Sequence, residues 1–297
     1  MASLGAMTID VPQRPQRPAG EPFGYCLNTS TIRGNQLGIV RNVDAAAKAG
    51  FHAIEPWITE LDAYTKDGGS LKDLGKRIAD AGLTVEGAIA FNAFLNDDAT
   101  ERAAALERLK VDMDKVAQIG GTRIAAPPGN NRAAAVTLDN AGRYYREALE
   151  LGETMGVQPL LELWGTHPLL GPLRNGVYAA VAAGRPDASL LLDVFHIYKS
   201  GTPFTSLAQI AGASLHLMHI NDYPQAADSS ALNDSHRVYP GDGVAPFRQI
   251  LRDLRDSGFR GYLSLELFNR EYWARSADET LKTGLDKIRS VVTRALS

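Results

Sequence analysis

One local pattern recurs along the chain: an amphipathic helical segment ends at a glycine, and a short apolar run follows. The glycines that end these segments are Gly50, Gly82, Gly120, Gly156, Gly184, Gly212 and Gly258. Glycine tolerates the left-handed backbone that stops a helix, so each position is predicted to be a helix-to-strand joint. With an earlier apolar run at 22–28 (PFGYCLN), these seven joints predict eight strands.

The predicted strands are short and almost continuously apolar, as in LLLDVF (190–195) and YLSLELF (262–268). Strands buried on both faces have this pattern, which is typical of a parallel sheet. Helical patterns such as 101–118 and 137–155 lie between them. Eight alternations of strand and helix predict an α/β protein, a single (β/α)₈ TIM barrel with a parallel eight-stranded core.

The alternative is an open, doubly wound sheet. Such a sheet usually carries a glycine-rich phosphate loop with the pattern G-x-G-x-x-G after its first strand. The segment that follows the first predicted strand, NTSTIRGNQLG (28–38), does not contain this pattern. We therefore expect the closed barrel.

Length and charge limit the classes of protein that fit. A chain of 297 residues is about the upper size for one hydrophobic core. Residues 1–20 are rich in Pro, Arg and Gln and are predicted to be a flexible N-terminal tail, so the catalytic barrel is expected at 21–297. The net charge of −3 gives no electrostatic reason to bind nucleic acid or an anionic membrane.

Compartment is predicted from the same overview. No apolar run approaches the roughly 18–20 residues that span a bilayer, and the N-terminus lacks the apolar core of a signal peptide. The chain has a single cysteine, Cys26, which excludes an intrachain disulfide and is typical of a reducing compartment. These features predict a cytoplasmic protein.

Polar residues occupy the predicted strand ends, where barrels place their functional side chains. They are Glu55 on the second strand, Glu162 on the fifth, Asp193 and His196 on the sixth, His219, Asn221 and Asp222 on the seventh, and Glu266 on the eighth. Glu162, Asp193 and Glu266 would crowd three negative charges between buried leucines, which is costly without a cation. With His219 they are predicted to bind one divalent metal ion.

The alternative to a metal is a salt-bridged network with Arg or Lys. The predicted strands offer few basic residues, and Arg123 lies near the start of the fourth strand rather than its end. Three carboxylates and one imidazole suit Mn²⁺, Mg²⁺, Co²⁺ or Fe²⁺, and Zn²⁺ is a further alternative. Because no cysteine ligand favours zinc, we expect Mn²⁺ or Mg²⁺.

The order and spacing of these residues match a known family. The specific parts are Glu162 in LLELWG, Asp193-Val-Phe-His196, His219-Ile-Asn-Asp222, Arg237 with Pro240-Gly241-Asp242-Gly243, and Glu266. In these motifs, residues 23–295 resemble the xylose-isomerase-like TIM-barrel superfamily, the sugar phosphate isomerases and epimerases, and are nearest to ketose 3-epimerases. The resemblance implies that Glu162, Asp193, His219 and Glu266 bind the metal and that His196 and Arg237 contact substrate oxygens.

The resemblance also implies a reaction. Glu162 and Glu266 would be an acid/base pair: one removes a proton beside a metal-bound carbonyl to give an enediolate, and the other returns a proton. We therefore expect a divalent-metal-dependent isomerase or epimerase of a ketose or related keto-sugar. The alternative is a dehydratase or lyase of a keto-inositol or dehydroshikimate-like substrate on the same barrel. A third alternative is a non-catalytic sugar-binding subunit, against which four intact ligands argue.

Two departures from the epimerase pattern are notable. The spacing of Asp234 and His236 is similar to that of apurinic-site endonucleases, which bind three zinc ions and need further histidines on early strands. The third and fourth predicted strands, LTVEGAIAF and TRIAAPPG, have none. The loop after the fifth strand, with Trp164 and His167, differs from that of the simplest epimerases and is expected to shape a different pocket.

Further substrate contacts are predicted at the mouth. Trp57, Trp164 and Phe268 lie at or beyond strand ends, where aromatic walls suit the carbon face of a sugar, although each could instead cap the barrel core. Glu55 is expected to contact substrate, with pairing to Arg33 or Lys66 as the alternative. The turn after Arg237 could bind a phosphate through backbone N–H groups. Because no further basic cluster follows, an unphosphorylated carbohydrate is favoured. The resemblance implies a homo-oligomer.

Overall fold

The computed structural model describes residues 21–129 and 135–297, so the predicted N-terminal tail lies outside the described residues. The strands are β1 (Gly24–Asn28), β2 (Ala53–Glu55), β3 (Thr84–Val85), β4 (Arg123–Ala126), β5 (Gln158–Glu162), β6 (Leu190–Asp193), β7 (Leu215–Ile220) and β8 (Tyr262–Leu265). All the pairs between them are parallel, in the order β3-β2-β1-β8-β7-β6-β5-β4. This arrangement confirms the predicted α/β barrel.

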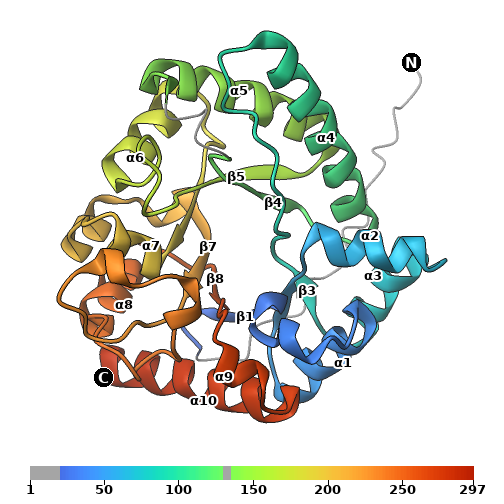
Figure 1. Ribbon diagram of the computed structural model, residues 1–297, viewed down its shortest axis with the longest axis vertical. Helices are drawn as coiled ribbons and strands as arrows, with labels where there is room; N and C mark the ends of the chain where they lie inside the picture. The colour runs from blue at the N-terminus through green and yellow to red at the C-terminus, as the bar shows by residue number, and fades with distance from the viewer. Residues whose placement is uncertain (1–20, 130–134) are drawn as a thin grey trace, which may run out of the picture.

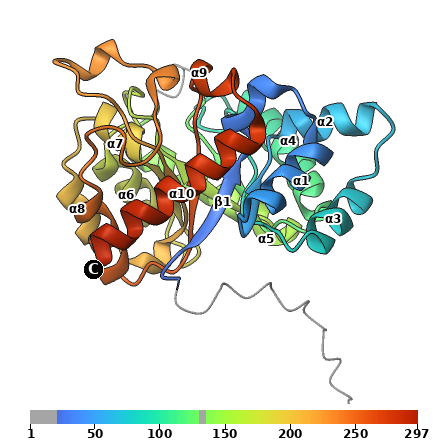
Figure 2. The ribbon, with the colours of Figure 1, turned by 90° about the horizontal axis from the view of Figure 1, so that it is seen from below.

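Helices cover the outside of the strands as a ring (Figure 1). The α-helices are α1 (Ile39–Ala49), α2 (Ile58–Lys66), α3 (Leu71–Asp80), α4 (Ala99–Gln118), α5 (Leu138–Met155), α6 (Leu173–Ala182), α7 (Val194–Lys199), α8 (Phe247–Asp256), α9 (Arg270–Trp273) and α10 (Ala277–Leu296). Short 3₁₀ helices are η1 (Thr29–Asn35), η3 (Phe204–Gln209), η4 (Gly212–Ser214), η5 (Ser229–Ala231) and η6 (Asp234–His236). In Figure 2, α10 from the end of the chain lies beside α1 from its start.

Among the described residues, β3 and β4 are the two ends of the sheet and are not joined by a ladder. β3 has two residues rather than the longer strand that LTVEGAIAF predicts. Beyond it, a bridge between Trp57 and Ile89 continues the contact with the second strand, and a hydrogen bond from Ala125 N to Ala88 O, 2.8 Å long, reaches β4. The chain after β3 therefore contacts β4 through an isolated hydrogen bond instead of a continuous ladder.

Six of the seven predicted helix-ending glycines have positive φ angles, from 62° to 91°. Gly212 is the exception and begins the short helix η4. A Cβ atom at Gly212 would lie 2.1 Å from the backbone nitrogen of Phe259, so this glycine is required by a close approach of two backbones. The glycine at this joint was predicted correctly, but the left-handed backbone predicted for it was wrong.

The core has two parts. A large cluster lies between the strands and the surrounding helices. A small cluster fills the barrel interior, and its fully or almost fully buried members are Cys26, Ala53, Ile89, Ala125, Leu160, Leu191 and Leu217. Because these apolar side chains plug the barrel, polar residues nearer the carboxyl ends of the strands sit above a closed floor.

None of the helices in the described part of the chain combines the length and the apolar character that crossing a membrane requires.

Tyr145 of α5 is expected to stabilise the strands that carry the site. Its buried hydroxyl donates to Ser189 O at 2.7 Å and accepts from Ser189 N at 3.0 Å, just before β6. Tyr145→Phe would leave the buried Ser189 N–H without this partner, while Ser189 O would keep Leu161 N as a donor, so we expect unfolding in urea to show a loss of about 1–3 kcal/mol. Tyr178→Phe, which removes a hydroxyl from an exposed ring, should lose much less. Equal losses in the two variants would contradict this account.

Candidate metal and substrate site

The four predicted metal ligands come together at the carboxyl ends of adjacent strands. Glu162 ends β5, Asp193 ends β6, His219 lies in β7 and Glu266 directly follows β8. The register pairs His219 with Asp193 on one side and with Ser264 on the other. All four side chains are buried, with His219 wholly inaccessible and the three acids at most 5% exposed.

The Nδ1 atom of His219 lies at the centre of this group. It is 3.2 Å from Glu266 Oε2, 3.7 Å from Asp193 Oδ2 and 4.0 Å from Glu162 Oε1. It is buried and, within the described part of the chain, forms no hydrogen bond of good geometry. Asp193, His219 and Glu266 offer ligand atoms that all lie within 4.8 Å of one another. A buried imidazole nitrogen that has no hydrogen-bond partner among the described residues and faces three carboxylates fits the role of a metal ligand.

Asp193 also organises the loop beside it. Its Oδ1 atom caps α7 by accepting from His196 N at 2.8 Å, and its Oδ2 atom accepts from Asn221 Nδ2 at 2.9 Å. The predicted strand 190–195 therefore ends at Asp193, because the chain turns into α7 at Val194. The cap directs His196 toward the mouth of the barrel.

Arg237 brings a positive charge that the strands do not supply. Its Nη1 donates to Asp193 Oδ2 at 2.9 Å and to Glu266 Oε2 at 2.7 Å, and its Nη2 donates to Asp234 Oδ1 at 2.6 Å. Part of the salt-bridged network considered as an alternative is therefore present. When Glu162, Asp193 and Glu266 are all ionised and His219 is neutral, as metal ligands must be, one guanidinium leaves two negative charges, which a divalent cation would balance.

The two glutamates have opposite acidities. Burial raises the pKa of Glu162 to about 8, and the charges of Glu266 and Asp193 add to this shift. Burial also acts on Glu266, but the charges of His219 and Arg237 outweigh it and hold the Glu266 pKa well below its usual range. Burial would lower the pKa of His219, yet Glu266 and Glu55 raise it overall. Near neutral pH one glutamate therefore keeps a proton while the other is ionised.

Metal binding is expected to strengthen as pH rises from 6 to 8. Glu162 and His219 both hold protons in the metal-free protein and must release them to bind a cation, since only the deprotonated forms are ligands. Calorimetric titration with Mn²⁺ should show the Kd falling roughly tenfold per pH unit for each proton displaced. Glu162→Gln should make this dependence less steep. A Kd that stays constant between these pH values would contradict the assignment.

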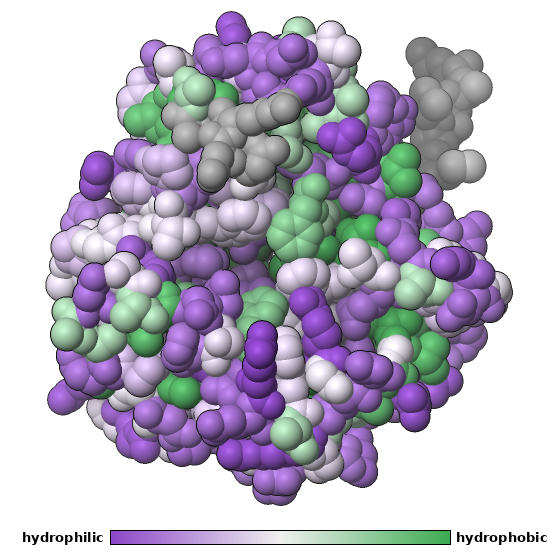
Figure 3. Space-filling model, viewed as in Figure 1, coloured by the Kyte–Doolittle hydropathy of each residue, from purple (hydrophilic) through white to green (hydrophobic). Residues whose placement is uncertain are grey.

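Above the ligands lies a cavity of about 300 Å³. Its lining includes His196, Arg237, Trp57, Trp164 and Phe268, five of the six predicted substrate contacts, together with Ile89, Phe91, Thr166 and Asp234. The aromatic rings form a connected wall. The ring centroid of Trp57 lies 5.3 Å from that of Phe91 and 6.1 Å from that of Phe268, and the centroids of Phe91 and Trp164 are 6.0 Å apart. In Figure 3 this face of the molecule is mainly hydrophilic around a central hollow.

The structure does not place the sixth predicted contact, Glu55, in the cavity wall. Glu55 has no exposed surface and lies beneath His219, where it accepts hydrogen bonds from Asn28 and Ser264. The alternative pairing with Arg33 is also not seen, because the guanidinium of Arg33 lies over the ring of Trp57 at 3.8 Å. Glu55 does lie at the end of β2, as predicted, but its side chain points toward the barrel interior beneath His219 rather than into the cavity.

Asp234 and His236 do not form a second metal site with His196. Arg237 Nη2 lies between Asp234 Oδ1, at 2.6 Å, and His196 Nε2, at 3.4 Å, so a guanidinium takes the place between them. The ring of His236 instead accepts from Asn233 N at 3.1 Å. Asp234 lines the cavity, a role that was not predicted from the sequence, because Asp234 was considered only for its spacing to His236.

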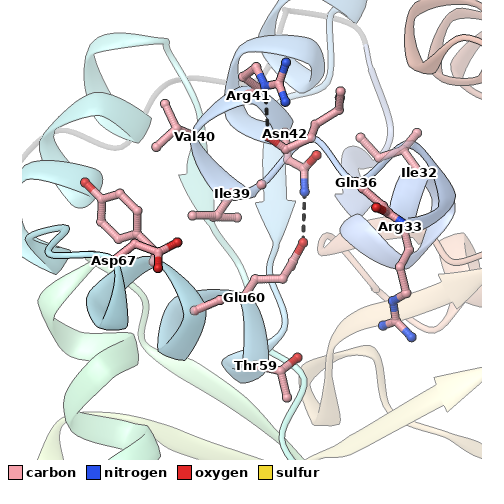
Figure 4. Close-up of a pocket in the computed structure, with 14 residues that line it drawn as sticks. Ile32, Arg33, Gln36, Ile39, Val40, Arg41, Asn42, Thr59, Glu60 and Asp67 are labelled. Carbon is pink, nitrogen blue, oxygen red and sulfur yellow. Dashed lines mark hydrogen bonds between the residues drawn. The ribbon is translucent and has the colours of Figure 1, made fainter.

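A larger cavity, about 550 Å³, lies outside the barrel between α1 and α2 (Figure 4). Its floor contains Glu60, whose carboxylate accepts from Asn42 Nδ2 and Trp57 N at 2.9 and 3.0 Å. The hydrogen bond from Trp57 N to Glu60 thus fixes the backbone of Trp57 on the side away from the barrel. Glu162 and Glu266, which have unequal acidities, line the smaller cavity beside the cluster that could hold a metal, so the smaller cavity is the candidate site.

Comparison with known proteins places this arrangement in a family. An inosose isomerase from Bacillus velezensis is 26% identical over 275 residues, covering 91% of this chain and 97% of the relative. A fructoselysine 3-epimerase from Shigella flexneri is 26% identical over 235 residues, covering 75% and 82%. A crystal structure described as an IOLI protein with a binding zinc atom has a TM-score of 0.85 and 25% identity, covering 93% of this chain and all of that one. The family model described as xylose isomerase-like TIM barrel matches residues 43–291. The chain therefore belongs to the xylose isomerase-like TIM barrel family.

Proposed function

We propose that this protein is a divalent-metal-dependent isomerase or epimerase of a keto-sugar or related polyol. The observation that carries the proposal is the pair of glutamates, Glu162 and Glu266, which flank one imidazole nitrogen and line one cavity with unequal acidities. Inversion or isomerisation beside a carbonyl needs one group that accepts a proton and one that donates a proton. The names of the two relatives, an isomerase and a 3-epimerase, support this reaction class.

The metal site would be formed by Glu162, Asp193, His219 and Glu266. When bound there, a divalent cation supplies Lewis-acid polarisation of substrate oxygens, which makes a neighbouring C–H group more acidic. Three carboxylates and one imidazole favour Mn²⁺ or Mg²⁺. Zinc, which is named for the similar IOLI structure, is the first alternative to compare.

The side chains divide the proton transfers between them. In the metal-free protein Glu266 has the lower pKa and is ionised, so it can accept a proton, while Glu162 has the higher pKa and is the one of the pair that more readily takes up a proton and returns it. Arg237 and His196 would hold the substrate oxygen that becomes negative in the enediolate. Burial lowers the pKa of His196, so its neutral ring can donate or accept one hydrogen bond without adding charge.

The structure also supports an unphosphorylated substrate. The turn after Arg237 was a candidate phosphate site, but its N–H groups are already used: Asp222 Oδ2 accepts from Gly241 N and Gly243 N, both at 2.9 Å. Asp222 Oδ1 accepts from Tyr223 N and Ala245 N at 2.8 and 2.9 Å. A buried carboxylate of the protein itself thus fills the place where a phosphate would bind. Arg237, the neighbouring cation, is engaged by carboxylates.

Glu266→Gln is expected to abolish turnover, by roughly 10²–10⁴-fold or more, because it removes the ionised proton acceptor. The measurement is exchange of the proton beside the carbonyl in D₂O, followed by NMR with Mn²⁺ and candidate ketoses or keto-inositols. Thermal unfolding of the variant should stay cooperative. Full exchange activity in the variant would contradict the assignment. Exchange accompanied by an ultraviolet enone signal would instead select the dehydratase.

A ketose should be a better substrate than its phosphate ester. The occupied turn leaves no backbone N–H groups at Gly241 and Gly243 for a phosphate, so we expect kcat/KM for the free sugar to exceed that for the ester. Both compounds can be measured in the same exchange assay. A clear preference for the phosphate ester would show that another cationic group recognises it.

The homo-oligomer that the resemblance implies also stays a proposal, and light scattering of the purified protein tests it.

A further inference from the structure

Beneath the metal ligands, Glu55 contacts the far side of the His219 ring. The Nε2 atom of His219 lies 3.1 Å from Glu55 Oε2 and 3.2 Å from Oε1, and both side chains are fully buried. The other ring nitrogen, Nδ1, faces the carboxylates of Asp193, Glu162 and Glu266. The two nitrogens of one imidazole therefore face two different acidic environments.

The Glu55 carboxylate is fixed from several strands. Its Oε2 atom accepts from Asn28 Nδ2 of β1 at 2.9 Å and from Ser264 Oγ of β8 at 2.8 Å. Gly87, just beyond β3, passes so close that a Cβ atom there would lie 2.9 Å from Glu55 Oε1. The barrel thus leaves space for a carboxylate at this position and holds it in one orientation.

Neutral imidazole carries one N–H donor and one acceptor, and its surroundings decide which nitrogen has the proton. A carboxylate can only accept, so Glu55 holds the proton on Nε2 and leaves the lone pair of Nδ1 directed at the ligand cluster. We propose that Glu55 is a positioning residue for the metal: it fixes the tautomer and the ring orientation of His219. This inference rests on the proposed metal-dependent function.

Charge supports the same role. The donors from Asn28 and Ser264 are neutral, so the positive charge that faces Glu55 comes through the His219 ring. A buried carboxylate is costly without a compensating cation. A metal on Nδ1 would supply that charge through the ring, so Glu55 and the cation stabilise each other. Removing the charge of Glu55 should therefore weaken metal binding although Glu55 does not touch the metal.

Asn28 connects Glu55 to two residues that line the cavity, Glu266 and Trp57. Its Nδ2 atom donates to Glu55 and also to Glu266 Oε1 at 3.2 Å, while its Oδ1 atom accepts from Trp57 Nε1 at 2.9 Å. One amide therefore links the carboxylate under the histidine to a proposed acid/base residue and to an aromatic ring of the cavity.

The test compares metal affinity in wild type, Glu55→Gln and Glu55→Ala by competition with a chelating dye, using Mn²⁺ and Zn²⁺ at pH 7.5. Loss of such an outer partner typically weakens metal binding by about 10–100-fold, and we expect a loss in this range for Glu55→Ala. Glu55→Gln keeps an acceptor but not the charge, so we expect a smaller loss.

Glu86→Gln is the matched control. Glu86 is also a buried barrel acid, but it pairs with Arg123 at 3.0 Å and not with His219. We expect it to lower thermal stability without changing the Kd of the metal. Equal weakening in the Glu86 and Glu55 variants would show that general loosening of the barrel, rather than Glu55, sets the affinity.

A second measurement needs no variant. In ¹⁵N-labelled wild type loaded with ¹¹³Cd²⁺, coupling should appear at Nδ1 of His219 and a slowly exchanging proton at Nε2. Coupling at Nε2, or Glu55 variants that bind metal as tightly as wild type, would overturn the inference and leave the proposed function standing. A wild-type protein that binds no divalent cation would overturn both.

Discussion

The structure depends on the electrostatic repulsion among three buried carboxylates and on what compensates it. Glu162, Asp193 and Glu266 are held close together by the register of a parallel barrel, in which β5, β6, β7 and β8 are successive hydrogen-bonded neighbours. Their side chains have almost no access to water. Such an arrangement is unfavourable on its own, and its persistence requires positive charge at this point.

Positive charge at this point would come from Arg237 and from the proposed metal ion. Arg237 supplies one fixed charge from the loop after β7 and contacts Asp193 and Glu266, but not Glu162. Glu162 is left with a raised pKa and a position 4.0 Å from the imidazole of His219. This unequal compensation separates the two glutamates chemically. In the metal-free protein the pKa of Glu162 is raised and that of Glu266 is lowered, and both side chains line the same cavity.

Much of this could be predicted from the sequence, because barrels make position along a strand equivalent to position in space. Glycine joints indicated the eight strands, and acids embedded among leucines indicated the ligands. The fold, the family and the grouping of Asp193, His219 and Glu266, with Glu162 4.0 Å from His219 Nδ1, follow from these local patterns. The direction of a side chain across the barrel was harder to predict, as Glu55 shows: it ends its strand but points beneath His219.

The other gaps have the same origin. Arg237 was expected to contact substrate, and its simultaneous pairing with Asp193 and Glu266 depends on how a long loop folds back over the mouth. The turn at Gly241 and Gly243 looked available for an anion because its partner, Asp222, is 19 residues from Gly241 and 21 residues from Gly243 in sequence. The short β3 likewise reflects packing at the seam of the barrel, which local hydrophobicity does not report.

The central claim is that a cation occupies the space between these carboxylates and His219 Nδ1. Anomalous diffraction at the manganese edge, from crystals grown with Mn²⁺, tests it most directly. The account predicts one strong peak within bonding distance of His219 Nδ1 and of the carboxylates of Glu162, Asp193 and Glu266. A map without a peak there, in which Arg237 alone neutralises the acids at full Mn²⁺ saturation, would contradict it.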